Sequence, residues 1–162
     1  MVRQPAGRGG MRISAKADYA VRAAVELAAA GNEKPIKAEA VANVQGIPLN
    51  FLENILGELR HAGIVRSQRG FEGGFRLARP AAEITIADII RAVEGPLASV
   101  RGGPPEDSEC PGAASELPRV WIAVRKNLRD VVERVTLADV AAGRLPRAVA
   151  KLSDDPDAWI TR

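Results

Sequence analysis

The stretch QGIPLNFLENILGELRHAGIVRSQRGFEGGFRLAR, residues 45–79, predicts the fold of this chain. It opens on a tight turn that contains Gly46 and Pro48 and continues as a helix that Gly63 ends. The apolar residues of this helix recur at helical spacing, at Leu52, Ile55, Leu56 and Leu59. With a short helix expected over 37–44, the pattern is that of two helices joined by a glycine-containing turn, a helix-turn-helix.

A β-hairpin is expected directly after this helix. Residues 64–67 and 75–78 are short strand patterns, the segment between them is rich in glycine, and Pro80 follows. A hairpin behind the second helix of a helix-turn-helix is a wing. The sequence therefore predicts a mainly α-helical fold with a small β-hairpin, in which residues 11–95 form a winged helix-turn-helix domain.

The hairpin also predicts a binding partner, because it combines cationic side chains with glycines, which have no side chain. Glycines allow positive φ and let the backbone approach another surface closely. Arginines bind phosphates with two hydrogen bonds and release counterions from a duplex. The residues that point to double-stranded DNA are Arg66, Arg69, Gly70, Gly73, Gly74 and Arg76, with Arg79 behind them. The alternative is a solvated turn with incidental arginines.

The helix after Pro48 carries polar residues opposite its apolar stripe, namely Asn50, Glu53, Asn54 and Arg60. Recognition helices use their N-terminal residues on base edges. Asparagine can pair with adenine, and glutamate can accept a hydrogen bond from the cytosine amine. We therefore expect these residues to contact DNA, with a solvated surface acid as the alternative for Glu53. Lys16 and Tyr19, on a helix expected over 14–30, are further candidates for contacts to phosphates.

Three other segments flank this domain. Residues 1–10, MVRQPAGRGG, are predicted to form a disordered arm, or alternatively an arm that places Arg3 and Arg8 in the minor groove. Residues 96–116 are expected to form a long loop rich in glycine, proline and acids. Residues 146–162 are expected to be a loose tail.

A long helix is expected over 117–134, with a short helix after it that completes a region ending at 145. Its apolar stripe consists of Trp121, Val124, Leu128, Val131, Val132 and Val135. This stripe is wider than one small domain needs, so we expect it to be covered by a second copy of the chain. A twofold dimer also matches palindromic DNA. The alternative is packing against the first helix of the same chain.

Composition excludes several classes of protein. The 162 residues carry a formal net charge of +3, with one cysteine and one histidine. One cysteine and one histidine are too few for an intrachain disulfide or a Cys/His zinc site. They also offer no catalytic constellation, so an enzyme is not expected. There is neither an apolar run of membrane-spanning length nor a signal-peptide pattern, so we expect a cytoplasmic protein without a membrane partner.

Three stretches in order, MRISAKADYAVRA (11–23), residues 45–79 and ITIADIIRAVEG (84–95), resemble the Rrf-type winged helix regulators, the family of IscR, NsrR and CymR. Trp121 and the TLADV of 136–140 extend the resemblance over about 11–143. It implies a homodimeric transcriptional regulator, a repressor by expectation, that binds a palindromic operator. In this family, base and groove contacts fall on the positions of Asn50, Glu53 and Arg69, and Lys16 and Tyr19 match positions near the DNA backbone.

The chain departs from the cluster-binding members of that family. They carry three cysteines in the loop before the long helix, so the resemblance implies that 96–116 is a sensor-type loop. This chain has Cys110 alone there, and Pro118 stands where some members have a histidine. Asp18 matches an acidic ligand of other members. Because an iron–sulfur centre needs about four ligands, we expect a cluster-less member without a cofactor.

The signal that such a regulator would sense stays open. Cys110 is a candidate redox switch or an inert loop residue, and the other inputs to consider are a small ligand or a protein effector. A further alternative is an interaction module that has lost DNA binding.

Overall fold

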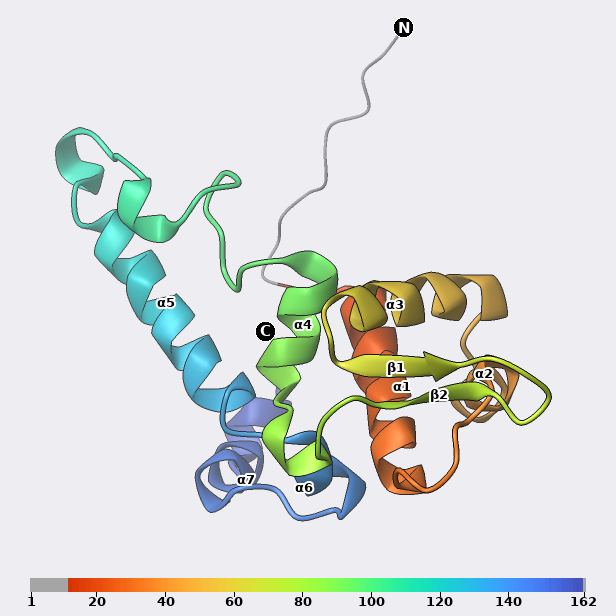
Figure 1. Ribbon diagram of the computed structural model, residues 1–162. Coiled ribbons are helices and arrows are strands. Elements are labelled where there is room, and N and C mark those ends of the chain that lie inside the picture. The colour runs from red at the N-terminus through yellow and green to blue at the C-terminus, as the bar shows by residue number, and fades with distance from the viewer. Residues whose placement is uncertain (1–11, 162) are drawn as a thin grey trace, which may run out of the picture.

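The computed structural model describes residues 12–161, which form a helical body with one two-stranded antiparallel sheet (Figure 1). The arm predicted for residues 1–10 lies outside the described residues. The helices are α1 (Ala15–Ala30), α2 (Ala38–Gln45), α3 (Leu49–His61), α4 (Ile86–Glu94), α5 (Leu117–Val132), α6 (Leu137–Ala141) and α7 (Arg147–Ser153). The strands are β1 (Val65–Gln68) and β2 (Gly74–Leu77), and short 3-10 turns lie at Ala81–Glu83, Pro105–Asp107, Gly112–Ala114 and Pro156–Trp159.

The central helix of the body is α1, which packs against α3, α4 and α6. Ser14 caps it, and its hydroxyl accepts a hydrogen bond from the Ala17 N–H at 3.0 Å. The apolar spacing of this helix predicts a buried face of Ala17, Ala20, Val21, Ala24, Val25 and Ala28. The residues that are buried are Ala17, Ala20, Ala23, Ala24 and Leu27. Val21, Val25 and Ala28 are only half-buried, because α1 has neighbours on more than one side and its alanines permit their close approach.

The predicted helix-turn-helix is confirmed in α2 and α3. Gly46 ends α2 in the left-handed conformation, with φ at 63°, which a residue without Cβ adopts at little cost. The turn is locked by Ile47, whose N–H donates to the Ala42 carbonyl at 3.0 Å and whose side chain is buried. The stripe predicted for α3 is fully buried, at 0% exposure for Leu52, Ile55, Leu56 and Leu59.

The predicted wing is also present. Strands β1 and β2 pair with Val65 opposite Leu77 and Arg66 opposite Arg76. A third segment joins the sheet through Ile36, just before α2, whose N–H and carbonyl bond to Phe75 at 2.8 and 2.7 Å. The hairpin is therefore fastened to the helix-turn-helix by backbone hydrogen bonds as well as by apolar packing.

Helix α6 belongs to this body, although the sequence grouped it with the dimerisation helix. Thr85 and Thr136 each form a capping box, with Asp88 and Asp139, and the two caps pair in an isolated β-bridge. The Leu137 N–H donates to the Ile84 carbonyl at 2.9 Å. Leu137 is fully buried, so the chain leaves the core after α4 and returns to it at α6.

Between these two points, the loop 96–116 leads from α4 to the far end of α5, and α5 stands out from the body (Figure 1). None of its side chains is buried, and Leu117, Val120, Ile122 and Leu128 are exposed. The helix ends at Val132 rather than at 134. Val135, predicted on the dimer interface, is instead 6% exposed, and its carbonyl accepts from the Ile86 N–H at 2.9 Å. Val135 therefore packs in the core of its own chain, and its assignment to the dimer interface was wrong.

The tail predicted as loose over 146–162 is ordered in part, which corrects the sequence analysis. It contains α7 and the 3-10 turn Pro156–Trp159, and the Trp159 indole N–H donates to the Ser153 carbonyl at 2.7 Å. This local bond folds the end of the chain back on α7. Within residues 12–161 no helix has the length and apolar character needed to cross a membrane.

Candidate nucleic-acid interface

The outward face of α3 carries the four residues that the sequence nominated there. Asn50, Glu53, Asn54 and Arg60 are all exposed, because the apolar stripe one half-turn away is fixed in the core. Pro48 precedes the helix and offers no side-chain cap, and the Asn50 side-chain oxygen accepts a hydrogen bond from the Phe51 N–H at 3.0 Å. The N-terminal turn thus presents polar side chains and backbone donors to the outside.

The wing lies beside α3 and presents uncompensated positive charge (Figure 1). Arg66 and Arg76 are direct neighbours across the strands, and Arg69 starts the turn. Among the residues that the structure describes, none of these three arginines forms an ion pair or a side-chain hydrogen bond. Like charges placed opposite each other in a sheet destabilise it, so the wing gains from an anion brought between them.

An open hollow joins the recognition helix to the base of the wing. It is lined by Arg60, Gly63, Val65, Arg66, Ser67, Ala78 and Arg79. The Arg60 guanidinium donates to the Ser67 hydroxyl at 3.3 Å, and Arg79 lies 4.0 Å from the Asp88 carboxylate. Three guanidinium groups around one hollow suit the phosphates of a duplex.

The two candidates on α1 contact α3 directly. The Lys16 ammonium lies 2.8 Å from the Glu58 carboxylate, so its charge is already partly matched within the chain. The Tyr19 ring meets Phe51 edge to face with centroids 5.8 Å apart, and the Arg22 guanidinium stands 5.5 Å from the Tyr19 centroid. Tyr19 is therefore held at the start of α3, near its polar N-terminal turn.

Two of the wing glycines have an intramolecular role that the sequence did not reveal. A Cβ on Gly74 would lie 2.5 Å from the Ile36 carbonyl carbon and oxygen, and a Cβ on Gly73 would lie 2.2 Å from the Gln68 carbonyl oxygen. The surface that these residues approach is thus the chain's own backbone, and Gly73 is buried. Only Gly70, with φ at 104° and open space around it, remains an exposed glycine of the turn.

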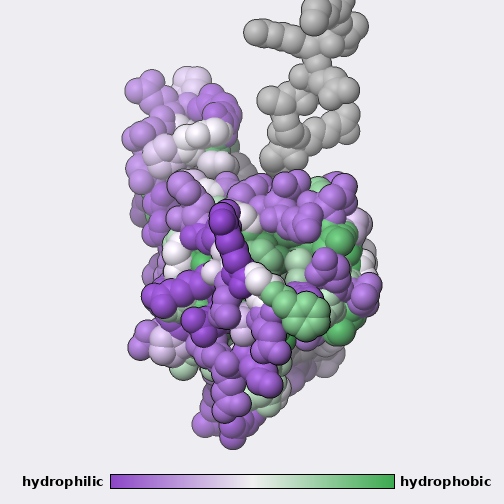
Figure 2. All heavy atoms as spheres, turned by 45° about the vertical axis from the view of Figure 1, so that its right-hand side comes forward, coloured by the Kyte–Doolittle hydropathy of each residue, from purple (hydrophilic) through white to green (hydrophobic). Residues whose placement is uncertain are grey.

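Sequence reasoning missed two residues of this surface. Lys37, which precedes α2, places its ammonium 5.3 Å from the centroid of the Phe71 ring at the tip of the wing. The aromatic residue between two glycines was a visible signal for Phe71, whereas the contact with Lys37 depends on the Ile36–Phe75 bridge. Figure 2 turns this side forward and shows a largely hydrophilic face with apolar atoms breaking through near its centre.

The loop 96–116 contains one of the cysteines that a cluster would need, Cys110. Cys110 is half-buried, and within residues 12–161 no three His, Cys, Asp or Glu side chains lie close enough to hold a metal ion. Asp18, the acid at the family's ligand position, instead accepts from the Arg22 guanidinium at 3.1 Å. Glu106 bonds to Arg125 of α5 at 2.7 Å.

Comparison with known proteins agrees with this geometry. A family model named Rrf2 and described as an iron-dependent transcriptional regulator matches residues 13–143. The chain is 52% identical to Rv1287, a candidate HTH-type transcriptional regulator of Mycobacterium tuberculosis (strain ATCC 25618 / H37Rv), over 90% of each protein. It is 36% identical to the HTH-type transcriptional regulator CymR of Bacillus subtilis (strain 168), over 82% of this chain and 91% of CymR.

Solved structures give the same assignment. The fold is similar to that of B. subtilis CymR, a global cysteine regulator, with a TM-score of 0.71, 32% identity, and coverage of 83% of this chain and 98% of CymR. It is also similar to T. potens IscR, with a TM-score of 0.66, 31% identity and 96% of each chain covered. These relatives are regulators and not enzymes. The winged helix, its arginine-rich hairpin and these matches together show that the chain belongs to the Rrf2 family of DNA-binding transcriptional regulators.

Proposed function

We propose that the chain acts as a homodimeric repressor that binds a palindromic operator. The observation that carries this proposal is the pairing of a polar recognition face on α3 with a wing in which Arg66, Arg69 and Arg76 have no acidic partner among the described residues. Each subunit would place α3 in the major groove of one half-site and close the wing and the Arg60 hollow on the flanking phosphates. Half-sites bound by such a dimer lie about 34 Å apart or a multiple of it.

The arm formed by α5 supports the dimer. Leu117, Val120 and Leu128 are spaced to share one face of the helix and are exposed in the single chain. An apolar face of this kind on a helix that stands away from its own body needs a cover. A second copy supplies it with the twofold symmetry that a palindrome requires.

The test is selection of duplexes by the full-length chain from a random library, followed by footprinting on the selected site. We expect an inverted repeat, protection of two half-sites and an affinity that falls steeply with salt, because several phosphates are neutralised. Binding that shows no sequence preference and no salt dependence would favour the interaction module that has lost DNA binding. Repression is tested by placing the selected site over a promoter with a reporter gene.

We also propose that no iron–sulfur cluster is bound by this chain's own side chains. The ligand count and the Asp18–Arg22 pair support this proposal. Protein purified under anaerobic conditions should show no visible charge-transfer absorbance and should bind the selected duplex without added iron. Stoichiometric iron and sulfide with such an absorbance would overturn the assignment.

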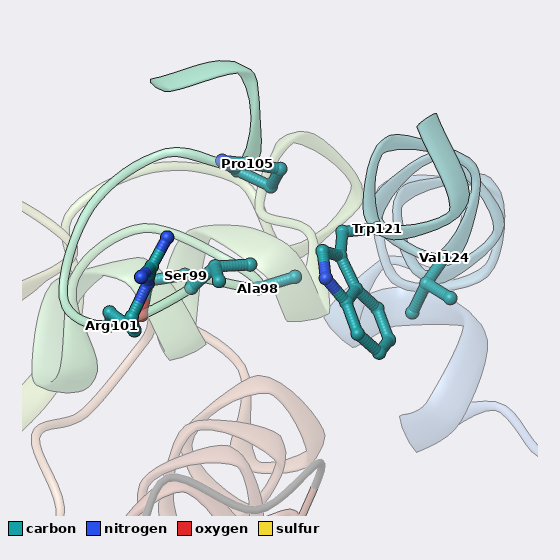
Figure 3. Close-up of a pocket in the computed structure, with 7 residues that line it drawn as sticks. Ala98, Ser99, Arg101, Pro105, Trp121 and Val124 are labelled. Atoms are coloured by element: carbon teal, nitrogen blue, oxygen red, sulfur yellow. The ribbon is translucent and has the colours of Figure 1, made fainter. Parts of the chain in front are cut away.

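A second candidate function is a response to a small ligand, and one hollow favours it (Figure 3). Trp121 and Val124 of α5 face a loop that contributes Ala98, Ser99, Arg101 and Pro105. Ala98 and Arg101, with φ of 54° and 52°, are the two non-glycine residues with positive φ in the described chain. Strained backbone of this kind clusters at ligand sites. The indole and the guanidinium together suit a planar apolar ligand with a negative group.

This response can be tested through the protein's own fluorescence. The chain has two tryptophans, Trp121 and Trp159, so Trp159→Phe leaves Trp121 as the sole reporter of the hollow. Benzoate and indole-carboxylates should quench it, and Arg101→Ala should abolish that response. A thiol response through Cys110 is tested separately, by comparing the operator affinity of reduced and peroxide-treated protein and of Cys110→Ser.

A further inference from the structure

The tip of the wing carries an apolar ring that the fold does not use. Phe71 is 91% exposed, the highest value among the exposed large apolar side chains of the described chain, above Trp159 at 79% and Ile13 at 78%. It makes no contact with the buried core, which recruits Phe75 from the same hairpin instead. An exposed aromatic at the end of a hairpin is a cost to solubility unless something binds it.

The backbone turn and one side-chain contact place Phe71 at the tip of the wing. Gly70 turns with φ at 104°, and the Gly73 N–H donates to the Gly70 carbonyl at 3.0 Å, which closes the turn beneath the ring. The Lys37 ammonium lies 5.3 Å from the ring centroid, a geometry that gives a cation–π attraction. Lys37 precedes α2, so this contact joins the ring to the helix-turn-helix, and Arg69 stands two residues before the ring in the chain.

An apolar ring beside a cation has one natural counterpart in a duplex. In a groove, apolar deoxyribose faces and base edges lie between two rows of phosphates. The tip of the wing and the start of α3 are at the same end of the domain (Figure 1). With α3 in the major groove, a tip that extends beyond the helix meets the adjacent minor groove, where proteins insert apolar side chains such as phenylalanine.

We propose that Phe71 enters the minor groove beside each half-site and packs on deoxyribose and base edges, while Lys37 holds a bordering phosphate. This inference rests on the proposed function, since it requires a bound duplex. The contact that Phe71 makes is apolar, and its strength depends on the shape of the groove. The wing then contributes to sequence preference at base pairs that α3 does not reach.

The experiment measures affinity for the duplex selected by the wild-type chain, at several salt concentrations. Phe71→Ala should weaken binding roughly ten-fold, the scale of an aromatic contact with a nucleotide. The slope of log affinity against log salt should not change, because no cation is removed. Phe71→Leu should restore most of the affinity, and Trp159→Ala, which removes an exposed aromatic elsewhere, should have no effect.

The groove itself is tested by replacing adenines beyond the half-site with 2,6-diaminopurine. This base adds an amino group to the minor groove and leaves the major-groove edge unchanged. The wild-type chain should lose affinity on the substituted duplex, and Phe71→Ala should lose none beyond its own deficit.

The proposal is overturned if Phe71→Ala binds within about two-fold of wild type, the range of a neutral surface change. It is also overturned if the variant responds to diaminopurine as wild type does, or if its salt slope falls as for a lost cation. An unchanged diaminopurine response would place Phe71 outside the minor groove. A lowered salt slope would mean that Phe71 only supports Lys37. Failure of the proposed function has a different signature, since the wild-type chain would then select no duplex at all.

Discussion

Arg66 and Arg76 face each other across the wing in register, and no carboxylate among the described residues pairs with either. Their neighbours Val65 and Leu77 point into the core and fix the register, so the two guanidinium groups share the opposite face. The free protein holds this repulsion, and a bound polyanion removes it. The two charges therefore destabilise the free protein and favour the binding of DNA.

Replacement of Arg76 by glutamine tests both effects, the stability of the free protein and its affinity for DNA. Arg76→Gln should stabilise the free protein by about 0.2–1 kcal/mol, the scale of a like-charged cross-strand pair, as measured by urea unfolding. It should also weaken DNA binding and reduce the salt slope by about 1. An unchanged salt slope would mean that Arg76 does not contact phosphate.

The assignment of base contacts depends on Arg69 and Glu53. Arg69→Ala should cost about 1–3 kcal/mol of binding free energy if the side chain reaches a base. Glu53→Ala should relax the preference for one base pair with a smaller loss of affinity, because it removes a negative charge from the face that meets phosphate. Both are measured by anisotropy on the selected duplex and its single-base variants. If neither variant changes affinity or preference, the recognition face has been wrongly assigned.

Gly74 and Gly57 form a matched pair for the structural role of a glycine. Gly74→Ala drives a methyl group to 2.5 Å from the Ile36 carbonyl, so the wing must separate from the segment before α2, at a cost of about 1–3 kcal/mol. Gly57 lies within α3 with open space around it, so Gly57→Ala should instead stabilise the free protein by about 0.5–1 kcal/mol. Thermal unfolding of the two variants checks the contrast. Equal effects would refute the close packing at Ile36.

The dimer is tested on the exposed face of α5. Leu128→Glu should yield a monomer at micromolar concentration in sedimentation, because an unpaired carboxylate cannot be buried between apolar helices. Its operator affinity should fall as well, since each half-site is then bound separately. Leu152→Glu, on the exposed surface of α7, is the control and should stay dimeric. A dimer that survives Leu128→Glu must use another surface.

The contact between the loop and α5 should depend on pH. The pKa of Glu106 lies below its ordinary value of 4.5, first because of a backbone hydrogen bond and then because of the side-chain bond from Arg125. A carboxyl group with a lowered folded pKa contributes fully above its unfolded pKa, and the contribution is lost as pH falls through the folded value. Acid titration followed by Trp121 fluorescence in the Trp159→Phe background should show this loss below about pH 4.5. Glu106→Gln should lack that step.

Much of the site was predictable from the chain because its signals are local. The stripe Leu52, Ile55, Leu56 and Leu59 fixes which face of α3 is buried, and the polar face then follows from helical geometry. The wing follows in the same way from two short strand patterns around a glycine-rich turn. The buried face of α1 was only partly predictable, because half of that helix is alanine and only its neighbours decide which alanines are covered.

By itself the sequence determined the helix-turn-helix, the wing, its arginines and the shortage of cluster ligands, since each depends on residue type and spacing along a short segment. Only the tertiary structure decided that α6 and Val135 belong to the core, that Gly73 and Gly74 pack on the chain's own backbone, and that Lys37 braces Phe71. Each of these rests on a contact between segments far apart in the chain or on a backbone clearance. Hydrophobic periodicity and composition do not specify such contacts, because many pairs of segments are compatible with the same pattern and only one of them is formed in the folded chain.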